Sequence, residues 1–311
     1  MRIFRHYEGL PEDYRQAVIA VGNFDGVHLG HQGVIQEAGR IAAANNVPWG
    51  VMTFEPHPRM YFKPGQPSFR ITPLRAKSHA VGTLDVDFMV VLRFDEDLAT
   101  MAAEQFIQHV LVDNLGVYHV VCGYDFSFGK GAAGNCELLL HMGMEAGFGM
   151  TAVGAIDDST GKPYSSTRVR EYLAAGDPRS AARLLDRPFE ISGRVSHGDK
   201  RGRTIGFPTA NVHLEDYMEP ARGVYAIRAA IDTGDEPVWL DGVANLGIRP
   251  MFETPESVLE VYIFDFAEDL YDRHLRVQLV EYLRPELMLD GLDALKSQIA
   301  KDCDQARDIL K

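Results

Sequence analysis

Two histidines in a glycine-containing turn near the start of the chain could bind phosphate groups. The segment Gly22–His31 reads GNFDGVHLGH and follows a run of buried character, Ala17–Val21. Gly26 and Gly30 remove side-chain bulk at points where a ligand could approach the backbone. His28 and His31 are three residues apart at the start of an expected helix, so they share one face.

The start of a helix also attracts anions, because its first N–H groups have no partner within the helix. A plain turn capped by Asp25, with two surface histidines, is the simplest alternative for this segment. A metal site built from His28, His31 and His57 is another alternative, although no nearby cluster supplies clear third and fourth ligands. The combined pattern favours a phosphate site on a strand–loop–helix.

Two later segments fit a nucleotide or a flat ring. Val121–Gly129 (VCGYDFSFG) follows a strand-like run and carries aromatic residues, among them Phe126 and Phe128, that could stack on a ring, or simply pack in the core. Tyr164–Arg170 (YSSTRVR) places three hydroxyls before two arginines at the start of an expected helix. Helix capping explains one hydroxyl, whereas three hydroxyls beside Arg168 and Arg170 suit a polyphosphate better.

A second glycine-rich segment lies in the other half of the chain. Gly193–Asn211 reads GRVSHGDKRGRTIGFPTAN, with glycines every four or five residues and the cations Lys200, Arg201 and Arg203 between the later ones. Such a loop can turn backbone N–H groups toward an anion. Thr209 and Asn211 are two residues apart on an extended chain, so their oxygen atoms point to one side and suit Mg²⁺. A glycine-rich hairpin with a solvated basic turn is the alternative.

A folded framework must position these segments. The hydrophobic pattern predicts two different folds, one in each half of the chain. Up to about residue 186, short apolar runs alternate with amphipathic stretches, which predicts βαβ units and a parallel sheet. Strands are expected over Ala17–Val21, Trp49–Phe54, Phe88–Leu92, His119–Cys122 and Thr151–Ile156, and helices over Leu29–Asn45, Ala102–Leu115 and Cys136–Glu145.

From residue 187 the pattern changes to strand-like runs separated by Gly, Asp and Pro, as in an antiparallel barrel or sandwich. Strands are expected over Phe189–Val195, Gly223–Ile231, Val238–Val243, Leu259–Phe266 and Leu275–Leu283, and a closing helix over Leu292–Leu310. We therefore predict two domains, 1–186 and 187–311.

Composition limits the possible partners and location. The net charge of −13 argues against general binding to nucleic acids or anionic membranes. Three cysteines without CxxC spacing fit a reducing compartment. No apolar run approaches membrane-spanning length and the N-terminus lacks a signal core. We expect a cytoplasmic protein with small-molecule substrates; self-association is possible but not indicated.

In the first half, the segments GNFDGVHLGH, Phe54–Pro58 (FEPHP), GYDFSFG and SSTRVR, in this order, resemble the adenylyltransferase module of bacterial riboflavin kinase/FAD synthetase. The resemblance implies a Rossmann-like nucleotidyltransferase domain of the HxGH type. It implies that His28, His31 and Arg168 act on the ATP phosphates. Implied nucleotide-binding residues are Gly22, Asn23, Phe24, Gly30, Ser165, Ser166 and Thr167. Implied flavin-side residues are Asp125, Phe126 and Phe128.

In the second half, GFPTAN, Gly223–Ala226 (GVYA), Gly242–Pro250 (GVANLGIRP) and Leu259–Phe266 (LEVYIFDF) resemble the riboflavin kinase module of the same family, an antiparallel β-barrel with a terminal helix. Glu260 matches the catalytic glutamate. Implied nucleotide-binding residues are Gly198, Arg203, Gly206, Thr209 and Asn211; the last two would also hold Mg²⁺, and Arg249 would lie on the flavin side.

The resemblance implies phosphorylation of riboflavin to FMN with ATP, and then adenylylation of FMN to FAD. Several positions depart from the family pattern. Met251 stands where Thr is usual, Val261-Tyr262 where Thr-His is usual, and Asp272 where Gly is usual, and Met288 or Leu289 replaces an aromatic residue that often follows the Arg-x-Glu segment. Two alternatives therefore stay open. Only the adenylyltransferase module could be active, or the chain could be a flavin- or nucleotide-binding regulator without turnover.

Overall fold

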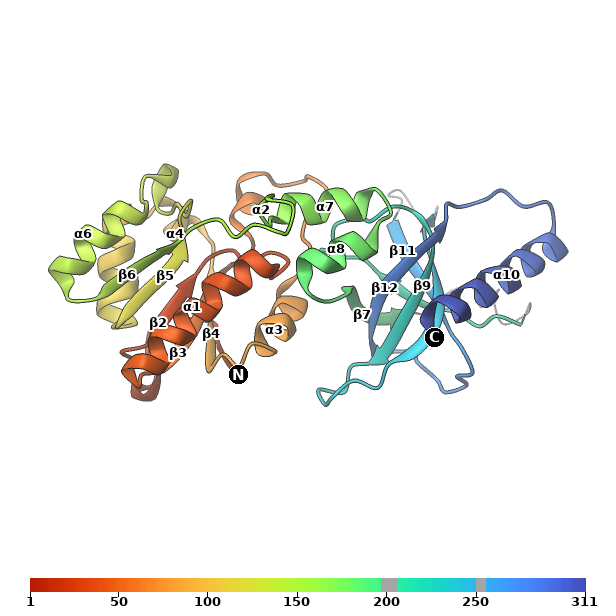
Figure 1. Cartoon of the computed structure of the whole chain (residues 1–311), viewed down its shortest axis with the longest axis horizontal. Coiled ribbons are helices and arrows are strands. Elements are labelled where there is room, and N and C mark those ends of the chain that lie inside the picture. Colours follow the sequence, from red (N-terminus) through yellow and green to blue (C-terminus); the bar gives the residue numbers. More distant parts are fainter. Residues whose placement is uncertain (197–205, 250–255) are drawn as a thin grey trace. The chain divides into compact units, whose positions relative to one another are not determined.

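The computed structural model describes residues 1–196, 206–249 and 256–311 (Figure 1). Contacts divide the chain into two compact units. The first contains Met1–Gln66 and Lys77–Ser165, and the second contains Pro67–Ala76 and Ser166–Lys311. Of the residues singled out in the sequence, Gly198, Arg203 and Met251 lie outside the described residues, as does the side chain of Arg249.

The first unit is built on a six-stranded sheet in the order β1-β4-β3-β2-β5-β6, in which all neighbouring strands are parallel. Its strands are β1 Arg2–Phe4, β2 Val18–Val21, β3 Trp49–Glu55, β4 Phe88–Arg93, β5 His119–Gly123 and β6 Gly149–Val153. Because the strands are parallel, all their carboxyl ends meet at one edge, where ligands bind in such sheets. The α/β fold predicted for this half is confirmed.

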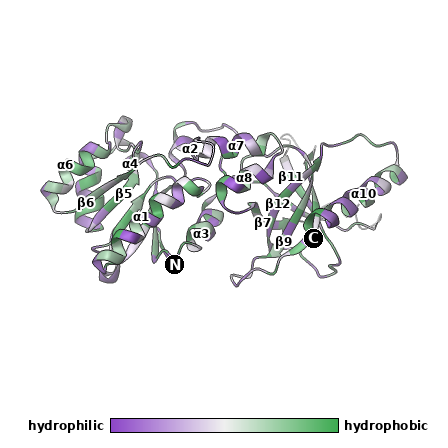
Figure 2. Cartoon of the chain, viewed as in Figure 1, coloured by the Kyte–Doolittle hydropathy of each residue, from purple (hydrophilic) through white to green (hydrophobic). Residues whose placement is uncertain are grey.

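Helices cover both faces of this sheet. The helices of this unit are α1 Leu29–Asn45, α2 Pro58–Phe62, α4 Glu96–Thr100, α5 Ala103–Gln105 and α6 Cys136–Ala146, with 3-10 turns at Glu12–Tyr14 and Lys130–Ala132. Helix α3, Leu74–Gly82, belongs to this unit from Lys77 onward. In β2, Val18 and Ala20 pack with α1, whereas Ile19 and Val21 pack into the opposite core. This two-sided burial explains why the strand reads as a continuous apolar run, and Figure 2 shows the strands coloured mainly hydrophobic.

One predicted helix has a different form. The pattern over Ala102–Leu115 predicted a single α-helix, but only the short α5 is α-helical, and a π-helix follows over Phe106–Asn114. The Leu115 N–H donates to the Val110 carbonyl, five residues earlier. Apolar periodicity does not separate these two helix types over so short a span, because both bury Phe106, Ile107 and Val110 on one side.

The second unit is a closed barrel with the strand order β10-β11-β8-β7-β12-β9, antiparallel throughout. Its strands are β7 Phe189–Ser196, β8 Ala210–His213, β9 Gly223–Ile231, β10 Leu240–Arg249, β11 Glu256–Ile263 and β12 His274–Arg284, and its helices are α7 Ser166–Ala174, α8 Pro178–Leu185 and α10 Leu292–Leu310. The barrel and terminal helix predicted from the sequence are confirmed.

Helix α10 covers part of the outer surface of the barrel. Its Cys303, Ala306 and Leu310 pack with Ala226 and Val243 in one apolar cluster. A bidentate ion pair between the Arg284 guanidinium and the buried Asp302 carboxylate links the helix to β12, with a closest N–O distance of 2.7 Å.

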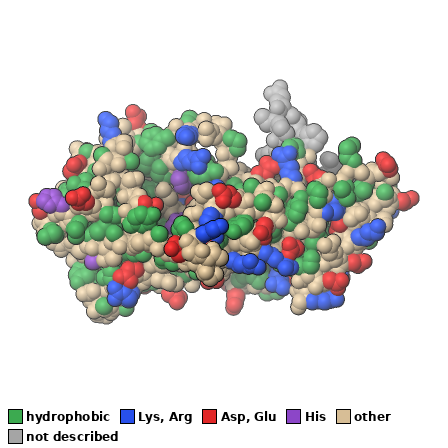
Figure 3. Space-filling view, turned by 45° about the horizontal axis from the view of Figure 1, so that its top comes forward, with side chains coloured by type: hydrophobic (Ala, Val, Ile, Leu, Met, Phe, Trp, Pro, Cys, Tyr) green, Lys and Arg blue, Asp and Glu red, His purple; other side chains and the backbone are tan. Residues whose placement is uncertain are grey.

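Among the described residues, no helix is long and apolar enough to span a membrane. Acidic, basic and hydrophobic side chains are mixed over the face drawn in Figure 3.

Tyr217 secures the segment between β8 and β9 against the barrel. Its hydroxyl accepts the Ser192 N–H at 3.1 Å and lies 3.1 Å from the Ser192 hydroxyl. Burial raises the pKa of this phenol to about 12. The neutral form therefore stabilises the fold below the ordinary tyrosine pKa of about 10, and this contribution decreases as the pH rises toward 12.

We predict that the stability advantage of the wild type over Tyr217→Phe shrinks between pH 10 and 12, by up to about 3 kcal/mol. Denaturant unfolding at several pH values, followed by Trp239 fluorescence in a Trp49→Phe background, measures this difference for the barrel. A difference independent of pH would show that the phenol does not titrate as its surroundings imply.

Candidate active sites

The turn that follows β2 has an unusual backbone. Phe24, Gly26 and Val27 have φ angles of +47°, +93° and +46°. Positive φ is easy for glycine but costs a β-branched residue such as valine of the order of 1–3 kcal/mol. Such conformations persist only where the surroundings hold them.

Several contacts hold this turn. The Phe24 ring lies under Gly22, where an added Cβ would be 2.9 Å from the ring. The Gln32 side chain, from α1, donates to the Val27 carbonyl at 3.1 Å. The Asn23 carbonyl accepts from the Lys77 ammonium at 2.8 Å and from the Thr53 hydroxyl at 3.1 Å. Gly22 is therefore required for the close approach of the Phe24 ring.

The two histidines of the turn lie against each other at the start of α1. Their rings stack with centroids 3.6 Å apart and an angle of 18° between planes. His28 is the N-cap of α1, because its Nδ1 accepts the His31 N–H at 3.3 Å; Asp25 does not have this role. A neutral His28 ring that accepts at Nδ1 carries its proton on Nε2, which leaves Nε2–H as a hydrogen-bond donor.

Gly30 permits this arrangement. A Cβ there would lie 3.1 Å from the His28 ring, so a larger residue would displace the imidazole. The structure thus places Gly22, Asn23 and Phe24 in the turn after β2, and His28, Gly30 and His31 at the start of α1, on the strand–loop–helix that the sequence predicted. Their binding roles stay predictions. The metal alternative gains no support, because no group of three or more His, Cys, Asp or Glu that could hold a metal occurs in the described part of the chain.

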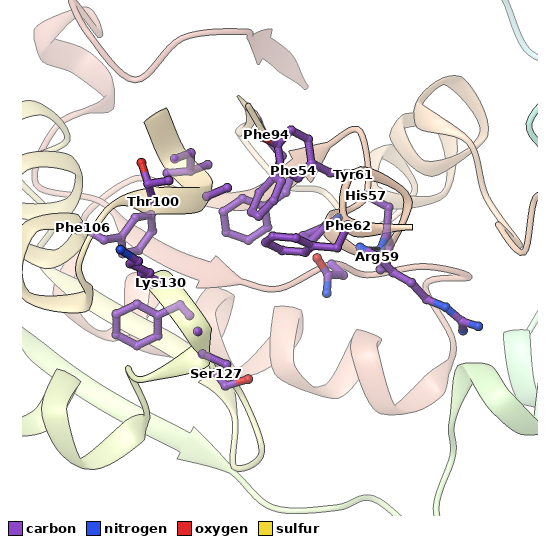
Figure 4. Close-up of a pocket in the computed structure, with 18 of the residues that line it drawn as sticks. Phe54, His57, Arg59, Tyr61, Phe62, Phe94, Thr100, Phe106, Ser127 and Lys130 are labelled. Atoms are coloured by element: carbon purple, nitrogen blue, oxygen red, sulfur yellow. Dashed lines mark hydrogen bonds between the residues drawn. The ribbon is translucent and has the colours of Figure 1, made fainter. Parts of the chain in front are cut away.

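A cavity of about 780 Å³ opens beside this turn (Figure 4). The segments that line it follow the carboxyl ends of β2, β3, β4 and β5. Its walls include Asn23, Phe54, His57, Arg59, Tyr61, Phe62, Phe94, Thr100, Phe106, Phe126, Ser127, Phe128 and Lys130. Asn23 belongs both to the histidine turn and to the cavity wall, so the two features are continuous.

The cavity has aromatic walls and a few cations. Phe54 and Phe94 meet edge to face with centroids 6.2 Å apart, and they lie together on one side in Figure 4. The rings of Phe126 and Phe128 stack with centroids 5.5 Å apart. Such walls suit a flat aromatic ligand, and the basic groups at the rim, of which Lys130 is one, suit a negatively charged tail on it.

The sequence predicted part of this cavity. Phe126 and Phe128 line it, whereas the third predicted flavin-side residue, Asp125, is exposed and does not belong to its wall. Arg59, Phe62, Phe94, Thr100, Phe106 and Lys130 were not predicted as site residues. The FEPHP segment, with His57 as the N-cap of α2, was the available signal for Arg59 and Phe62.

The predicted phosphate-binding hydroxyls are divided between the two units. Ser165 ends the first unit, and Ser166, Thr167 and Arg168 form the first turn of α7, which is grouped with the second unit. The division falls within the predicted motif. The participation of these residues in the same site as the histidines stays a prediction.

In the barrel, strand register aligns a row of polar residues. Glu260 of β11 is directly opposite Asn211 of β8 and Asn245 of β10, and Asn211 is also opposite Ser196 of β7. Directly paired residues of antiparallel strands project from the same face. The Asn245 amide in turn donates to the Glu286 carboxylate at 3.4 Å. The structure therefore brings the predicted Asn211 and Glu260 together.

A second cavity, of about 420 Å³, lies at the end of the barrel. Thr209, which precedes β8, lines it together with Pro208, Ala210 and the segment 266–271. Gly206 is exposed, with a φ of +93°, a conformation that favours glycine. The hydroxyl of Thr209 and the amide of Asn211 are hard oxygen donors close together in the chain, which is the donor chemistry that Mg²⁺ prefers.

Two of the departures from the family pattern have a structural explanation. Asp272 has a φ of +62°, a left-handed conformation that Asp tolerates better than most residues and that Gly adopts freely. Tyr262 packs edge to face on Phe207, with centroids 5.5 Å apart, as part of the apolar cluster under α10. Neither substitution removes a member of the polar row.

The chain thus has two modules whose sites suit nucleotides. The first is a parallel sheet with a histidine turn and an aromatic cavity, and the second is a barrel with an Asn–Glu row. Comparison with known families agrees with this division: the FAD synthetase model matches residues 10–168 and the riboflavin kinase model matches residues 185–310. This chain belongs to the family of bifunctional riboflavin kinases/FMN adenylyltransferases, and the resemblance noted in the sequence is confirmed.

Three relatives illustrate this membership. Proteins named bifunctional riboflavin kinase/FMN adenylyltransferase are 42% identical over 303 residues in Escherichia coli K12, covering 97% of this chain and 96% of that one. The protein of this name from Pseudomonas fluorescens is 41% identical over 308 residues, which cover 99% of this chain and 97% of that one. The one from Bacillus subtilis is 38% identical over 302 residues, which cover 96% of this chain and 93% of that one.

A solved structure has the same fold along the whole chain. It is the crystal structure of a protein from Streptococcus pneumoniae named Macrolide-efflux Protein, with a TM-score of 0.84, 29% sequence identity and 99% coverage of both chains. That name belongs to the streptococcal protein and carries no argument about the activity of this chain.

Proposed function

We propose that this chain makes FAD from riboflavin in two steps, each in its own module. The barrel module transfers the γ-phosphoryl group of ATP to riboflavin, which gives FMN and ADP. The parallel-sheet module then adenylylates FMN with a second ATP, which gives FAD and pyrophosphate. The observation that carries this proposal is the presence of two separate constellations, the stacked histidine turn beside an aromatic cavity and the Asn–Glu row of the barrel.

In the kinase step, Glu260 takes the proton from the ribityl hydroxyl as that oxygen attacks the γ-phosphorus. Its direct pairing with Asn211 supports this role, because a base must lie close to the phosphate-binding groups. ATP enters as its Mg²⁺ complex, in which the ion neutralises charge on the phosphates. Thr209 and Asn211 would hold that complex, with Gly198, Arg203 and Gly206 on its phosphates and Arg249 on the flavin side.

In the adenylylation step, a phosphate oxygen of FMN attacks the α-phosphorus of ATP and pyrophosphate leaves. This nucleophile needs no strong base, because a phosphate monoester with a second pKa of about 6 is largely dianionic at pH 7. Catalysis then consists of positioning and charge stabilisation. His28, His31, Ser165, Ser166, Thr167 and Arg168 would supply the stabilising donors, and the aromatic cavity would hold the isoalloxazine ring, with Asp125 near its mouth.

We place the boundary between the modules at residues 186 and 187. The end of the FAD synthetase match at residue 168 and the start of the riboflavin kinase match at residue 185 support a boundary in this part of the chain. We also place the protein in the cytoplasm. The three cysteines are free thiols in the structure, as is usual in a reducing compartment. Riboflavin, FMN and ATP are then its partners.

His28→Asn separates the chemical role of the histidine from its structural role. The asparagine oxygen can still cap α1, but the Nε2–H donor is lost. We expect adenylylation of supplied FMN to fall by about a hundredfold or more, while phosphorylation of riboflavin by the same sample is unchanged. If both activities fell equally in a folded variant, the assignment of one reaction to each module would be wrong.

Glu260→Gln should have the opposite effect. The amide keeps the size of the side chain but cannot accept a proton, so we expect riboflavin phosphorylation to fall about 10²–10⁴-fold. Supplied FMN should still be converted to FAD at the wild-type rate. Chromatographic measurement of FMN and FAD reports both activities, and an unchanged kinase rate would exclude Glu260 as the base.

A further inference from the structure

A lysine enclosed in the first unit contacts the histidine turn from the inside. Lys77, in α3, is 1% exposed. Its ammonium donates to the Asn23 carbonyl at 2.8 Å and to the Thr53 hydroxyl at 3.1 Å, and it forms an ion pair with Glu55 at 3.4 Å. Burying an ammonium costs several kcal/mol unless such partners offset it. No motif in the sequence indicates a role for this residue.

The contact determines the direction of one peptide group. In a trans peptide the carbonyl and the N–H point in opposite directions. The Asn23 carbonyl points inward to Lys77 and Thr53, so the Phe24 N–H of the same peptide points away from them. Asn23 is exposed between the buried Gly22 and Phe24, and it lines the aromatic cavity. Within the described part of the chain, the Phe24 N–H donates to no protein group.

The peptide also lies in the strained part of the turn. Phe24 has a φ of +47°, and the peptide could rotate to relieve it if the carbonyl were released. Two donors converge on this one oxygen, and the Thr53 hydroxyl that donates to it at 3.1 Å also accepts from Lys77. Removal of the ammonium would therefore weaken both restraints on the Asn23–Phe24 peptide.

We propose that Lys77 is a positioning residue for adenylyl transfer. It does not touch the substrate; it holds the Asn23–Phe24 peptide so that the amide donates to charge that builds on the ATP phosphates as pyrophosphate leaves. This role rests on the proposed function. Because the donor is needed most in the transition state, its loss lowers kcat more than it raises KM.

Lys77→Met removes the ammonium and keeps the aliphatic stem. We expect kcat for adenylylation of FMN to fall about ten- to hundredfold, with the KM values for ATP and FMN within about threefold of the wild type. Riboflavin phosphorylation by the same chain serves as an internal control for the fold and stays unchanged. Arg40→Met, which removes an exposed cation from the middle of α1, should leave both activities unchanged.

A double variant separates positioning from simple destabilisation. Lys77→Met alone removes the cation that forms an ion pair with the Glu55 carboxylate, which could disturb the unit for electrostatic reasons. Glu55→Gln/Lys77→Met removes the negative charge as well, and it is the variant to measure if the single one does not fold. Positioning predicts that kcat stays low in the double variant although its melting temperature recovers.

Recovery of kcat in the double variant would overturn the role of Lys77, and so would a single variant with wild-type kcat. Parallel loss of kinase activity in the double variant would do the same, because the effect would then not be confined to the turn. A wild-type chain that forms no FAD from FMN and ATP would instead contradict the proposed function. The two failures are thus distinguished by the wild-type sample.

Discussion

The backbone between Gly22 and His28 is the constraint on which the first module depends. Phe24 and Val27 adopt positive φ angles that cost of the order of 1–3 kcal/mol each, so the free chain rarely visits this turn. The folded unit holds it by burying the Phe24 ring and by bonding the Asn23 and Val27 carbonyls from neighbouring elements. The histidines at the start of α1 and the mouth of the cavity keep their positions because this turn is fixed.

The two modules position their reactive groups by different means. In the parallel sheet, residues far apart in the sequence meet because every strand ends at the same edge, as Phe54 and Phe126 do around the cavity. In the barrel, the register of antiparallel strands sets Glu260 opposite Asn211. A slip of one residue would move Glu260 to the barrel interior, where Leu259 is now fully buried. The burial of apolar neighbours such as Leu259 therefore fixes the strand register on which the kinase site depends.

Much of the fold followed from local pattern, since the limits of α1, β9 and α10 agree with the apolar periodicity. Motif resemblance located the histidine turn and Glu260. The remaining site residues depend on tertiary contacts that no short segment reveals. Phe94 follows β4 and Lys130 follows β5. They become cavity residues only when β4 pairs with β3 and β5 pairs with β2 in the sheet. Lys77 resembles an ordinary surface lysine until α3 folds over the turn.

With both modules active, one chain performs two successive transfers. The most direct test is a time course of the wild-type protein with riboflavin, ATP and Mg²⁺, in which flavins, ADP and pyrophosphate are separated and quantified. We expect FMN to appear first and FAD to follow, with one ADP per riboflavin consumed and one pyrophosphate per FAD formed. Accumulation of FMN without FAD, or binding of riboflavin without consumption of ATP, would contradict it.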